Sequence, residues 1–245
     1  MAENIYLRRV KRDERAQWDV SIYPFNIPVI KRFEELEFKK SVTYIIGDNG
    51  SGKSTLLEAI AMLLGINPEG GSKNFNFHTV NTHSNLSESL RMVRASLNYS
   101  DTFFFRAESF YNVSSEIDRL GKDIYKYYGG KSLHEQSHGE GFISLIENRL
   151  KSRGIYIFDE PEAALSFQNQ LIFLCWIKQA ITKGAQIIIA THSPVVLSFP
   201  DACIYEIDGD QLVEKQYQEC NVYLNLMSFM THREYFFKEL ELILQ

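Results

Sequence analysis

A glycine-rich segment near the N-terminus carries residue types suited to holding phosphate. It follows the apolar run Val42–Ile46 and reads Gly47-Asp48-Asn49-Gly50-Ser51-Gly52-Lys53-Ser54-Thr55. Glycines allow positive φ, so successive backbone N–H groups can converge on an anion at the start of a helix. Lys53 adds charge for the β and γ phosphates, and the Ser54 hydroxyl is a hard ligand for Mg²⁺. The segment predicts a P-loop that binds a nucleoside triphosphate with Mg²⁺.

A pair of carboxylates follows another apolar run. The residues Ile155–Phe158 predict a buried strand, and Asp159-Glu160-Pro161 comes directly after it. One carboxylate at such a strand end can hold Mg²⁺ through water, while its neighbour polarises the attacking water. We assign Asp159 to the metal and Glu160 to the base. Acidic residues that begin the next helix would account for Glu162, but not for an Asp–Glu pair directly behind an apolar strand.

A histidine stands at the end of a third apolar run, where Thr191-His192-Ser193-Pro194 follows Ile187–Ala190. A lone histidine is more often a packing residue. Because this one comes after the Asp–Glu strand and a long helix, we expect His192 to contact the γ phosphate. His192, Lys53 and Glu160 are the candidate catalytic residues.

These side chains need a scaffold that brings strand ends together. Apolar, β-branched and aromatic runs predict buried strands at Val42–Ile46, Phe103–Phe105, Ile155–Phe158, Gln186–Ala190 and Cys203–Ile207. Helical spacing and terminal glycines predict helices at Lys53–Leu64, Phe142–Leu150 and Ala164–Thr182. The predicted fold class is α/β, with a mixed sheet covered by helices on both faces.

Two further segments are defined by composition. Residues 67–85 are rich in Gly, Asn, Ser and His, which predicts a loop or a weakly paired edge. Residues 223–244 carry apolar and aromatic side chains at helical spacing. We expect one or two helices there that pack on the domain, with a partner-docking surface as the alternative.

In their order along the chain, these motifs resemble those of ATP-binding-cassette (ABC) ATPases. The resemblance is to the branch that includes structural-maintenance-of-chromosomes (SMC) and double-strand-break-repair ATPases and their compact bacterial relatives, and it covers most of the chain. It implies ATP and Mg²⁺ as cofactors and hydrolysis of ATP. It also implies a nucleotide-binding lobe at 1–108 and 151–220, a helical signature subdomain at 109–150, and C-terminal helices at 221–245.

The signature motif of that family precedes the Asp–Glu strand, and Gln136-Ser137-His138-Gly139-Glu140 stands at that place as a degenerate form. By the resemblance, Ser137 and the Gly139 backbone would contact the γ phosphate on the P-loop of a second subunit, with a helix N-terminus as the anion site. Glu140 belongs to the same candidate nucleotide-binding motif. ATP binding would then draw two copies into a homodimer.

Two positions depart from the family pattern. Ser166 stands where the loop after Glu160 usually has Asp, which weakens any claim about coupling between the two sites. The Gln that follows the central strand is missing, because Phe103–Phe105 continues into Arg106-Ala107-Glu108. Glu108 is the candidate replacement and a candidate metal ligand.

Other functional classes share parts of this pattern. His134-Glu135-Gln136-Ser137-His138 fits HExxH, the motif of zinc hydrolases, which needs one continuous helix through both histidines. The neighbouring Gly129, Gly130, Gly139 and Gly141 favour a loop that enters a helix instead. A transporter's ATPase subunit is a second alternative, and the missing Gln argues against it. A small-molecule kinase would share only the P-loop.

Composition places the chain among ordinary globular proteins. It has 245 residues, 44% hydrophobic and 23% charged, enough for a sizeable core. Cys175, Cys203 and Cys220 lie far apart, which favours reduced thiols. The N-terminus lacks the apolar centre of a signal peptide, and no apolar run reaches the length of a membrane span. We therefore expect a cytoplasmic protein without direct membrane insertion.

The partners are less clearly indicated by the sequence. A net charge of −5 argues against nonspecific coating of nucleic acid. DNA contact stays open through the basic residues Arg8, Arg9, Lys11, Arg12, Arg15, Lys31, Arg32, Lys39 and Lys40. No sustained heptads lie between Lys53 and Ser137, so coiled-coil arms are not expected. The resemblance points to DNA repair, mobile-element control or anti-phage defence beside a separately encoded nuclease or toxin, with a slow ATP sensor as the rival to a motor.

Overall fold

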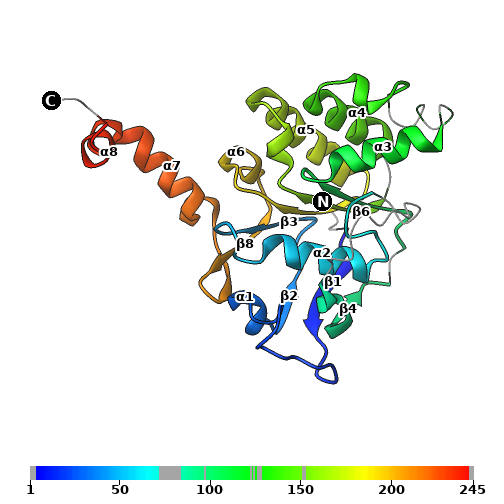
Figure 1. The fold of residues 1–245 in the computed structure, drawn as a ribbon, viewed down its shortest axis with the longest axis horizontal. Helices are drawn as coiled ribbons and strands as arrows, with labels where there is room; N and C mark the ends of the chain where they lie inside the picture. Colours follow the sequence, from blue (N-terminus) through cyan, green and yellow to red (C-terminus); the bar gives the residue numbers. More distant parts are fainter. Residues whose placement is uncertain are drawn as a thin grey trace.

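The computed structural model describes residues 4–71, 84–96, 98–121, 123, 125, 129–150 and 153–242. Its centre is a six-stranded sheet in the order β5-β6-β7-β3-β8-β9 (Figure 1). The strands are β3 (Val42–Ile46), β5 (Asp101–Arg106), β6 (Gly154–Asp159), β7 (Gln186–Ala190), β8 (Cys203–Asp208) and β9 (Gln211–Glu214). Neighbours are parallel except β8 and β9. The predicted α/β class with a mixed sheet is confirmed, and each run predicted as a strand forms one.

A second sheet, antiparallel and three-stranded, has the order β2-β1-β4. It consists of β1 (Leu7–Arg12), β2 (Glu35–Glu37) and β4 (Leu90–Arg94). The sequence did not predict it. The pairing of β1 with β4 shifts register between Leu7 and Arg9, so buried Leu7 and Val10 are separated by two exposed residues. Such a bulge breaks the alternation by which a half-buried strand is recognised.

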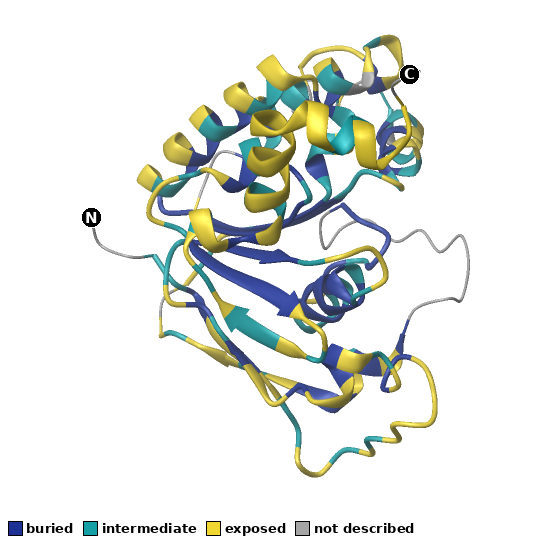
Figure 2. Ribbon diagram, turned by 90° about the vertical axis from the view of Figure 1, so that its left-hand side faces the viewer, coloured by how far each residue is buried: buried dark blue, intermediate teal, exposed yellow. Residues whose placement is uncertain are grey.

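Helix α2 (Lys53–Leu63) lies between the two sheets. Its Leu56 and Ile60 are in one buried cluster with Val10 of β1 and with Ile45 and Ile157 of the central sheet. Figure 2 shows that burial is densest in the central sheet and in the helix beneath it. The P-loop helix is therefore held on both sides, and its N-terminus is fixed relative to the strand ends.

The opposite face of the central sheet carries α3 (Phe110–Leu120), α4 (His138–Arg149), α5 (Phe167–Thr182) and α6 (Pro194–Leu197), as Figure 1 shows. Aromatic rings fill the space between these helices and the sheet: Phe105, Phe142, Phe158, Phe173 and Trp176. The Trp176 indole N–H donates to the Ile146 carbonyl at 3.0 Å, which ties α5 to α4. Because residues on both faces of β6 are buried, its run reads as continuously apolar.

Several short elements connect these layers. They are α1 (Pro28–Lys31) and the 3₁₀ helices η1 (Asn85–Ser89), η3 (Leu133–Glu135), η4 (Pro161–Ala164) and η5 (Tyr217–Glu219). Most of the segment predicted as a loop, at residues 67–85, lies outside the described residues. Within the part of the chain that the structure describes, no helix is long and apolar enough to cross a membrane.

The C-terminal segment forms two helices, α7 (Asn221–Thr231) and α8 (Arg233–Glu239), as the sequence predicted. Only the start of α7 packs on the domain, where Val222 lies against the core beneath α6, and neither helix contains a buried residue. In Figure 1 they extend outward from the body beyond α6. Beyond the first turn of α7 the expectation of core packing was wrong, because helical spacing shows which residues are apolar but not what covers them.

Candidate functional site

The predicted site residues meet at one edge of the central sheet. Parallel register sets Arg106 beside Asp159 and Asp159 beside Ala190, while β3 ends alongside them at Ile46. The P-loop leaves β3 at this edge, and Glu160 and His192 leave β6 and β7 there. A shared carboxyl edge is where parallel α/β sheets place their ligands.

The loop after β3 has the backbone that phosphate binding requires. Gly47, Gly50 and Gly52 have φ of 151°, 75° and 105°. A Cβ on Gly52 would lie 3.0 Å from side-chain carbons of both Ile27 and Val29. Glycine is therefore required at Gly52 for its φ and for the close approach of α1. The Ser51 hydroxyl is buried and has no hydrogen-bond partner among the described residues.

Lys53, the first residue of α2, folds back over the loop. Its Nζ donates to the carbonyls of Gly47 and Asp48, at 2.9 Å each. The ammonium is buried, and desolvation lowers its pKa, while Glu160 and Asp159 act in the opposite direction. A cation held inside a curled loop supplies charge to an anion bound there.

Ser54 and Asp159 form the predicted metal pair. The Ser54 hydroxyl donates to Asp159 Oδ1 at 3.2 Å, which joins α2 to the end of β6. Burial raises the pKa of Asp159 to about 6, although Arg106 and Ser54 favour its charged form. A carboxylate desolvated to this degree gains most from a nearby cation, and hydroxyl and carboxylate oxygens are the ligands that Mg²⁺ prefers.

Arg106 is a site residue that sequence reasoning missed. It ends β5, and its guanidinium lies 2.6 Å from Glu58 of α2, 3.3 Å from Glu108 and 3.5 Å from Asp159. The sequence did show an arginine directly after the three phenylalanines of a predicted strand. In the structure this arginine is in register with Asp159. Glu108, predicted as a metal ligand, is exposed and faces Arg106, so its metal role stays a prediction.

Glu160 and His192 face each other across the site. His192 Nε2 lies 3.4 Å from Glu160 Oε1, and both side chains are partly exposed. Glu160 adopts the left-handed conformation, with φ 50° and ψ 52°. Its backbone N–H donates to Ala190, and the N–H of His192 donates to Glu162 Oε1 at 2.5 Å. These bonds lock the two loops together, so the strained backbone at Glu160 is a feature of the site.

The predicted signature stands at the start of α4. Ser137 is the N-cap: its hydroxyl accepts from the Glu140 N–H, and the Glu140 carboxylate accepts from the Ser137 N–H. Hydrogen bonds from Ser137 lower the pKa of Glu140. A Cβ on Gly139 would meet Asn169 at 2.8 Å and the Ala164 carbonyl at 3.1 Å. The glycine therefore allows α4 to approach the loop after Glu160.

The HExxH alternative fails on this geometry. His134 lies in η3, Gln136 is extended, and α4 begins only at His138, so no continuous helix carries both histidines. His134 instead lies 3.0 Å from the Ser115 hydroxyl. No group of three or more His, Cys, Asp and Glu side chains that could hold a metal ion occurs among the described residues.

Five of the nine basic residues proposed to face DNA are paired with carboxylates. Arg9 lies 3.2 Å from Glu37, and Arg12 lies 3.9 Å from Glu34. Lys39 lies 2.6 Å from Glu214, Arg32 lies 2.8 Å from Asp210, and Lys40 is paired with Asp201. The charge that would attract phosphate is therefore offset on the same surface.

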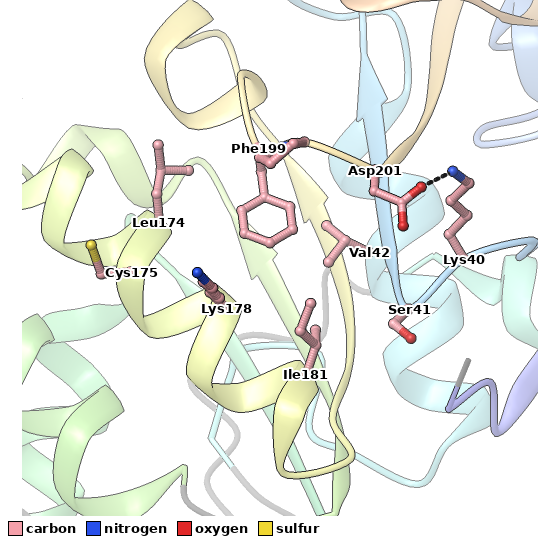
Figure 3. A pocket seen from close by; sticks show the side chains of 10 residues that line it. Lys40, Ser41, Val42, Leu174, Cys175, Lys178, Ile181, Phe199 and Asp201 are labelled. Atoms are coloured by element: carbon pink, nitrogen blue, oxygen red, sulfur yellow. Dashed lines mark hydrogen bonds and ion pairs between the residues drawn. The ribbon is translucent and has the colours of Figure 1, made fainter. Parts of the chain in front are cut away.

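A cavity of about 450 Å³ lies at the other end of β3, away from the P-loop. Figure 3 shows Val42 of β3, Leu174 and Ile181 of α5, and Phe199 turned toward it, with the Lys40–Asp201 pair on one side. None of the predicted nucleotide-site residues lines this cavity. It is separate from the site at the carboxyl edge.

Comparison with known proteins gives the chain's relatives. A family model described as "AAA domain" matches residues 24–180. The cytochrome c biogenesis ATP-binding export protein CcmA of Rhizobium johnstonii is 29% identical over 170 residues, 62% of this chain and 76% of that protein. The retron Vc95 probable ATPase of Vibrio cholerae is 26% identical over 147 residues, 55% of this chain and 27% of that protein.

A solved structure bears on the fold alone. The structure of cbiO1 from Clostridium perfringens, described as part of the ABC transporter complex cbiONQ, has a TM-score of 0.53 at 18% identity. It covers 94% of this chain and 97% of its own. The predicted ABC-type P-loop fold is therefore confirmed.

Proposed function

The chain belongs to this AAA-domain family, and from that premise we propose that two copies bind ATP and Mg²⁺ between them and hydrolyse the ATP. The observation that carries the proposal is the convergence at one sheet edge of a glycine-shaped anion loop, a hydroxyl–carboxylate pair and a second carboxylate facing a histidine. Each group suits one part of phosphoryl transfer to water.

The residues have distinct roles in this proposal. The loop N–H groups and Lys53 hold the β and γ phosphates, and Ser54 and Asp159 hold Mg²⁺, with Asp159 acting through water. The cation neutralises phosphate charge. Glu160 accepts the proton of the attacking water, while His192, 3.4 Å away, orients the γ phosphate. Thr55, Asp48 and Asn49 complete the loop around the phosphates.

The second copy supplies the signature. Ser137 and Glu140 are exposed at the N-terminus of α4, where backbone N–H groups and the helix dipole favour an anion. α4 belongs to the helical layer on one face of the sheet, and α2 lies on the other face. We assign Ser137 and the Gly139 backbone to the γ phosphate on the partner's P-loop, and Glu140 to the capping box that holds Ser137 in place.

The first test uses Glu160→Gln. Loss of the base should lower phosphate release by about 10²- to 10⁴-fold while ATP binding is kept. With ATP and Mg²⁺ the variant should accumulate as a closed dimer. Small-angle scattering measures the closure, and the hydrodynamic radius should fall relative to that of an open pair of copies. Turnover within tenfold of wild type would remove Glu160 from its role.

The shared site has a sharper test, which mixes two inactive variants. Glu160→Gln disables the P-loop side, and Gly139→Ala disables the signature side. A mixed dimer has one site in which the intact halves of the two chains meet, so turnover should return when the variants are co-expressed. If each chain had a self-sufficient site, mixing would give no more than the sum of the two activities.

What the ATPase drives is the second part of the proposal. A transporter subunit is supported by the names of two relatives, which are an export protein and part of a transporter complex. A partner outside the membrane is supported by the missing Gln, which in such subunits couples to a membrane domain: β5 continues into Arg106-Ala107-Glu108, and Arg106 is bound to Glu58 and Asp159. We propose a separately encoded effector, such as a nuclease or toxin, in DNA repair or anti-phage defence.

The similarity to a retron ATPase agrees with this choice, and the pairing of the basic residues speaks against a broad DNA surface. The ATP-trapped Glu160→Gln protein, purified from its own host, should retain a soluble effector. Recovery of an integral membrane protein in a fixed ratio would favour the transporter assignment.

A further inference from the structure

The two C-terminal helices expose an unusual amount of apolar surface. The exposed large side chains between residues 224 and 242 are Leu224, Leu226, Met227, Phe229, Met230, Tyr235, Leu240 and Leu242, with Met230 68% exposed. In α7 the polar residues Asn221, Asn225 and Ser228 lie together on one side, and the rest of the helix is a broad apolar face formed by Val222, Tyr223, Leu226, Met227, Phe229 and Met230. A helix of this kind normally packs its apolar face against another surface, and 11 residues are too few to span a bilayer, which needs about 20.

The charges of this surface limit what can cover it. No residue of α7 is charged, since its sequence is NVYLNLMSFMT. α8 carries Arg233 and Lys238 together with Glu234 and Glu239, so its charges balance. Nucleic acid and anionic lipid both require an excess of positive charge, which is absent here. The surface of α7 and α8 is therefore suited to bind a protein surface that is also apolar and without net charge.

The helix pair is held in shape by its own rings. Phe229 of α7 has ring centroids 5.7 Å from Phe236 and 6.2 Å from Phe237 of α8. The Arg233 guanidinium stacks over Phe237 at 4.9 Å. A hollow of about 710 Å³ lies at the turn, lined by Met230, Thr231, His232, Arg233, Glu234, Tyr235 and Phe237. A preformed shape of this kind loses little entropy when it binds.

The start of α7, from which the two helices extend, lies next to the proposed nucleotide site. The Asn221 N–H, at the start of α7, donates to the Glu206 carboxylate at 3.1 Å. Glu206 is buried in β8, is bound by Lys215 at 2.6 Å, and is in register with Ile46, the residue before the P-loop. The Tyr217 hydroxyl also bonds to Pro194 of α6, which follows His192. The helices therefore start from the edge at which the proposed two-copy site would form.

We propose that α7 and α8 bind the same helices of a second copy, in a two-fold contact that persists without nucleotide. Such a contact sets neutral α7 against neutral α7 and lets the balanced charges of α8 pair across the axis. The turn hollow of each copy receives apolar side chains of the other. Its use, to keep two nucleotide lobes at high local concentration, rests on the proposed function, but the contact itself does not.

The test measures the mass of the nucleotide-free protein by sedimentation at micromolar concentration. Wild type should sediment as two copies of the 28.4-kDa chain. The double variant Leu226→Glu/Met230→Glu should be a monomer, with a dimer dissociation constant raised about a hundredfold or more. Both side chains are exposed within one chain, so the variant should fold and bind ATP normally. Tyr111→Glu, at an exposed apolar residue of α3, is the matched control and should stay dimeric.

Identity of the partner is tested by cross-linking. In a Cys175→Ser background, which removes the exposed cysteine, Met230→Cys should join two chains through a short bis-maleimide, and Tyr111→Cys should not. A monomeric wild type without nucleotide, or a dimer that survives both glutamates, would overturn the proposal. Closure of Glu160→Gln by ATP is scored separately, so a monomer that dimerises only with ATP rejects this contact and keeps the shared site.

Discussion

At the scale of single residues, Arg106 shows how one side chain links binding to stability. Its side chain is 16% exposed and forms ion pairs with Glu58, Glu108 and Asp159. The side chains of Glu58 and Asp159 are also largely buried. Glu58 raises the pKa of Asp159, and Arg106 lowers it more. The arginine therefore keeps two neighbouring carboxylates compatible at the place where the metal pair forms.

Arg106→Met should consequently destabilise the nucleotide-free protein by about 3 to 5 kcal/mol, because it leaves buried carboxylates without their countercharge. Urea unfolding at pH 7.5 measures the loss. The double variant Arg106→Met/Glu58→Gln should recover more than half of it, since one of the two repelling charges is removed. A single-variant loss below 1 kcal/mol would mean that solvent, rather than Arg106, compensates these carboxylates.

At the scale of elements, the start of α4 is placed by packing as well as by its cap. Gly139→Ala should displace α4, because the added Cβ would lie 3.1 Å from the Ala164 backbone carbonyl, which cannot turn aside as the Asn169 amide at 2.8 Å can. We expect turnover to fall at least tenfold, with ATP affinity little changed because the P-loop is untouched. Phosphate release and nucleotide titration measure the two effects.

Gly141→Ala is the control one half-turn further on. Its Cβ would meet only ordinary contacts, at 3.4 Å to Phe110 and 3.5 Å to the Leu133 carbonyl. Alanine in a helix is favoured over glycine by roughly 0.5–1 kcal/mol, so this variant should be active and slightly more stable. Equal activity of the two alanine variants would show that the approach of α4 to α5 does not matter for turnover.

The same elements show what could be predicted from the sequence. The ends of three strands were identified because a buried parallel strand is continuously apolar. The site residues Gly47, Asp159 and His192 follow these apolar runs within one or two residues. The glycines on both sides of His134 and His138 were a local signal too, and they favoured a loop entering a helix over HExxH. Arg106 could not be assigned, because its partners Glu58 and Asp159 come from distant segments. The exposure of α7 depends on a covering surface that its own pattern does not describe.

At the scale of the whole molecule, the relation between turnover per chain and protein concentration tests whether α7 and α8 hold two copies together. If α7 and α8 hold the copies together, the nucleotide lobes meet within one assembly, at an effective concentration on the order of millimolar. Wild-type turnover per chain should then be constant from about 10 nM to 10 µM. The exposed side chains of these helices, and not the sheet edge, would set that range.

Leu226→Glu/Met230→Glu should make catalysis bimolecular while leaving every nucleotide-site residue in place. Its turnover per chain should rise in proportion to concentration at low protein and approach the wild-type value at high protein, because ATP must then gather free copies. Tyr111→Glu should behave as wild type. Phosphate release measured over this dilution series distinguishes the models. Constant turnover in the helix variant would mean that each chain hydrolyses ATP alone. The same concentration dependence in wild type and in the helix variant would mean that α7 and α8 do not hold the copies together.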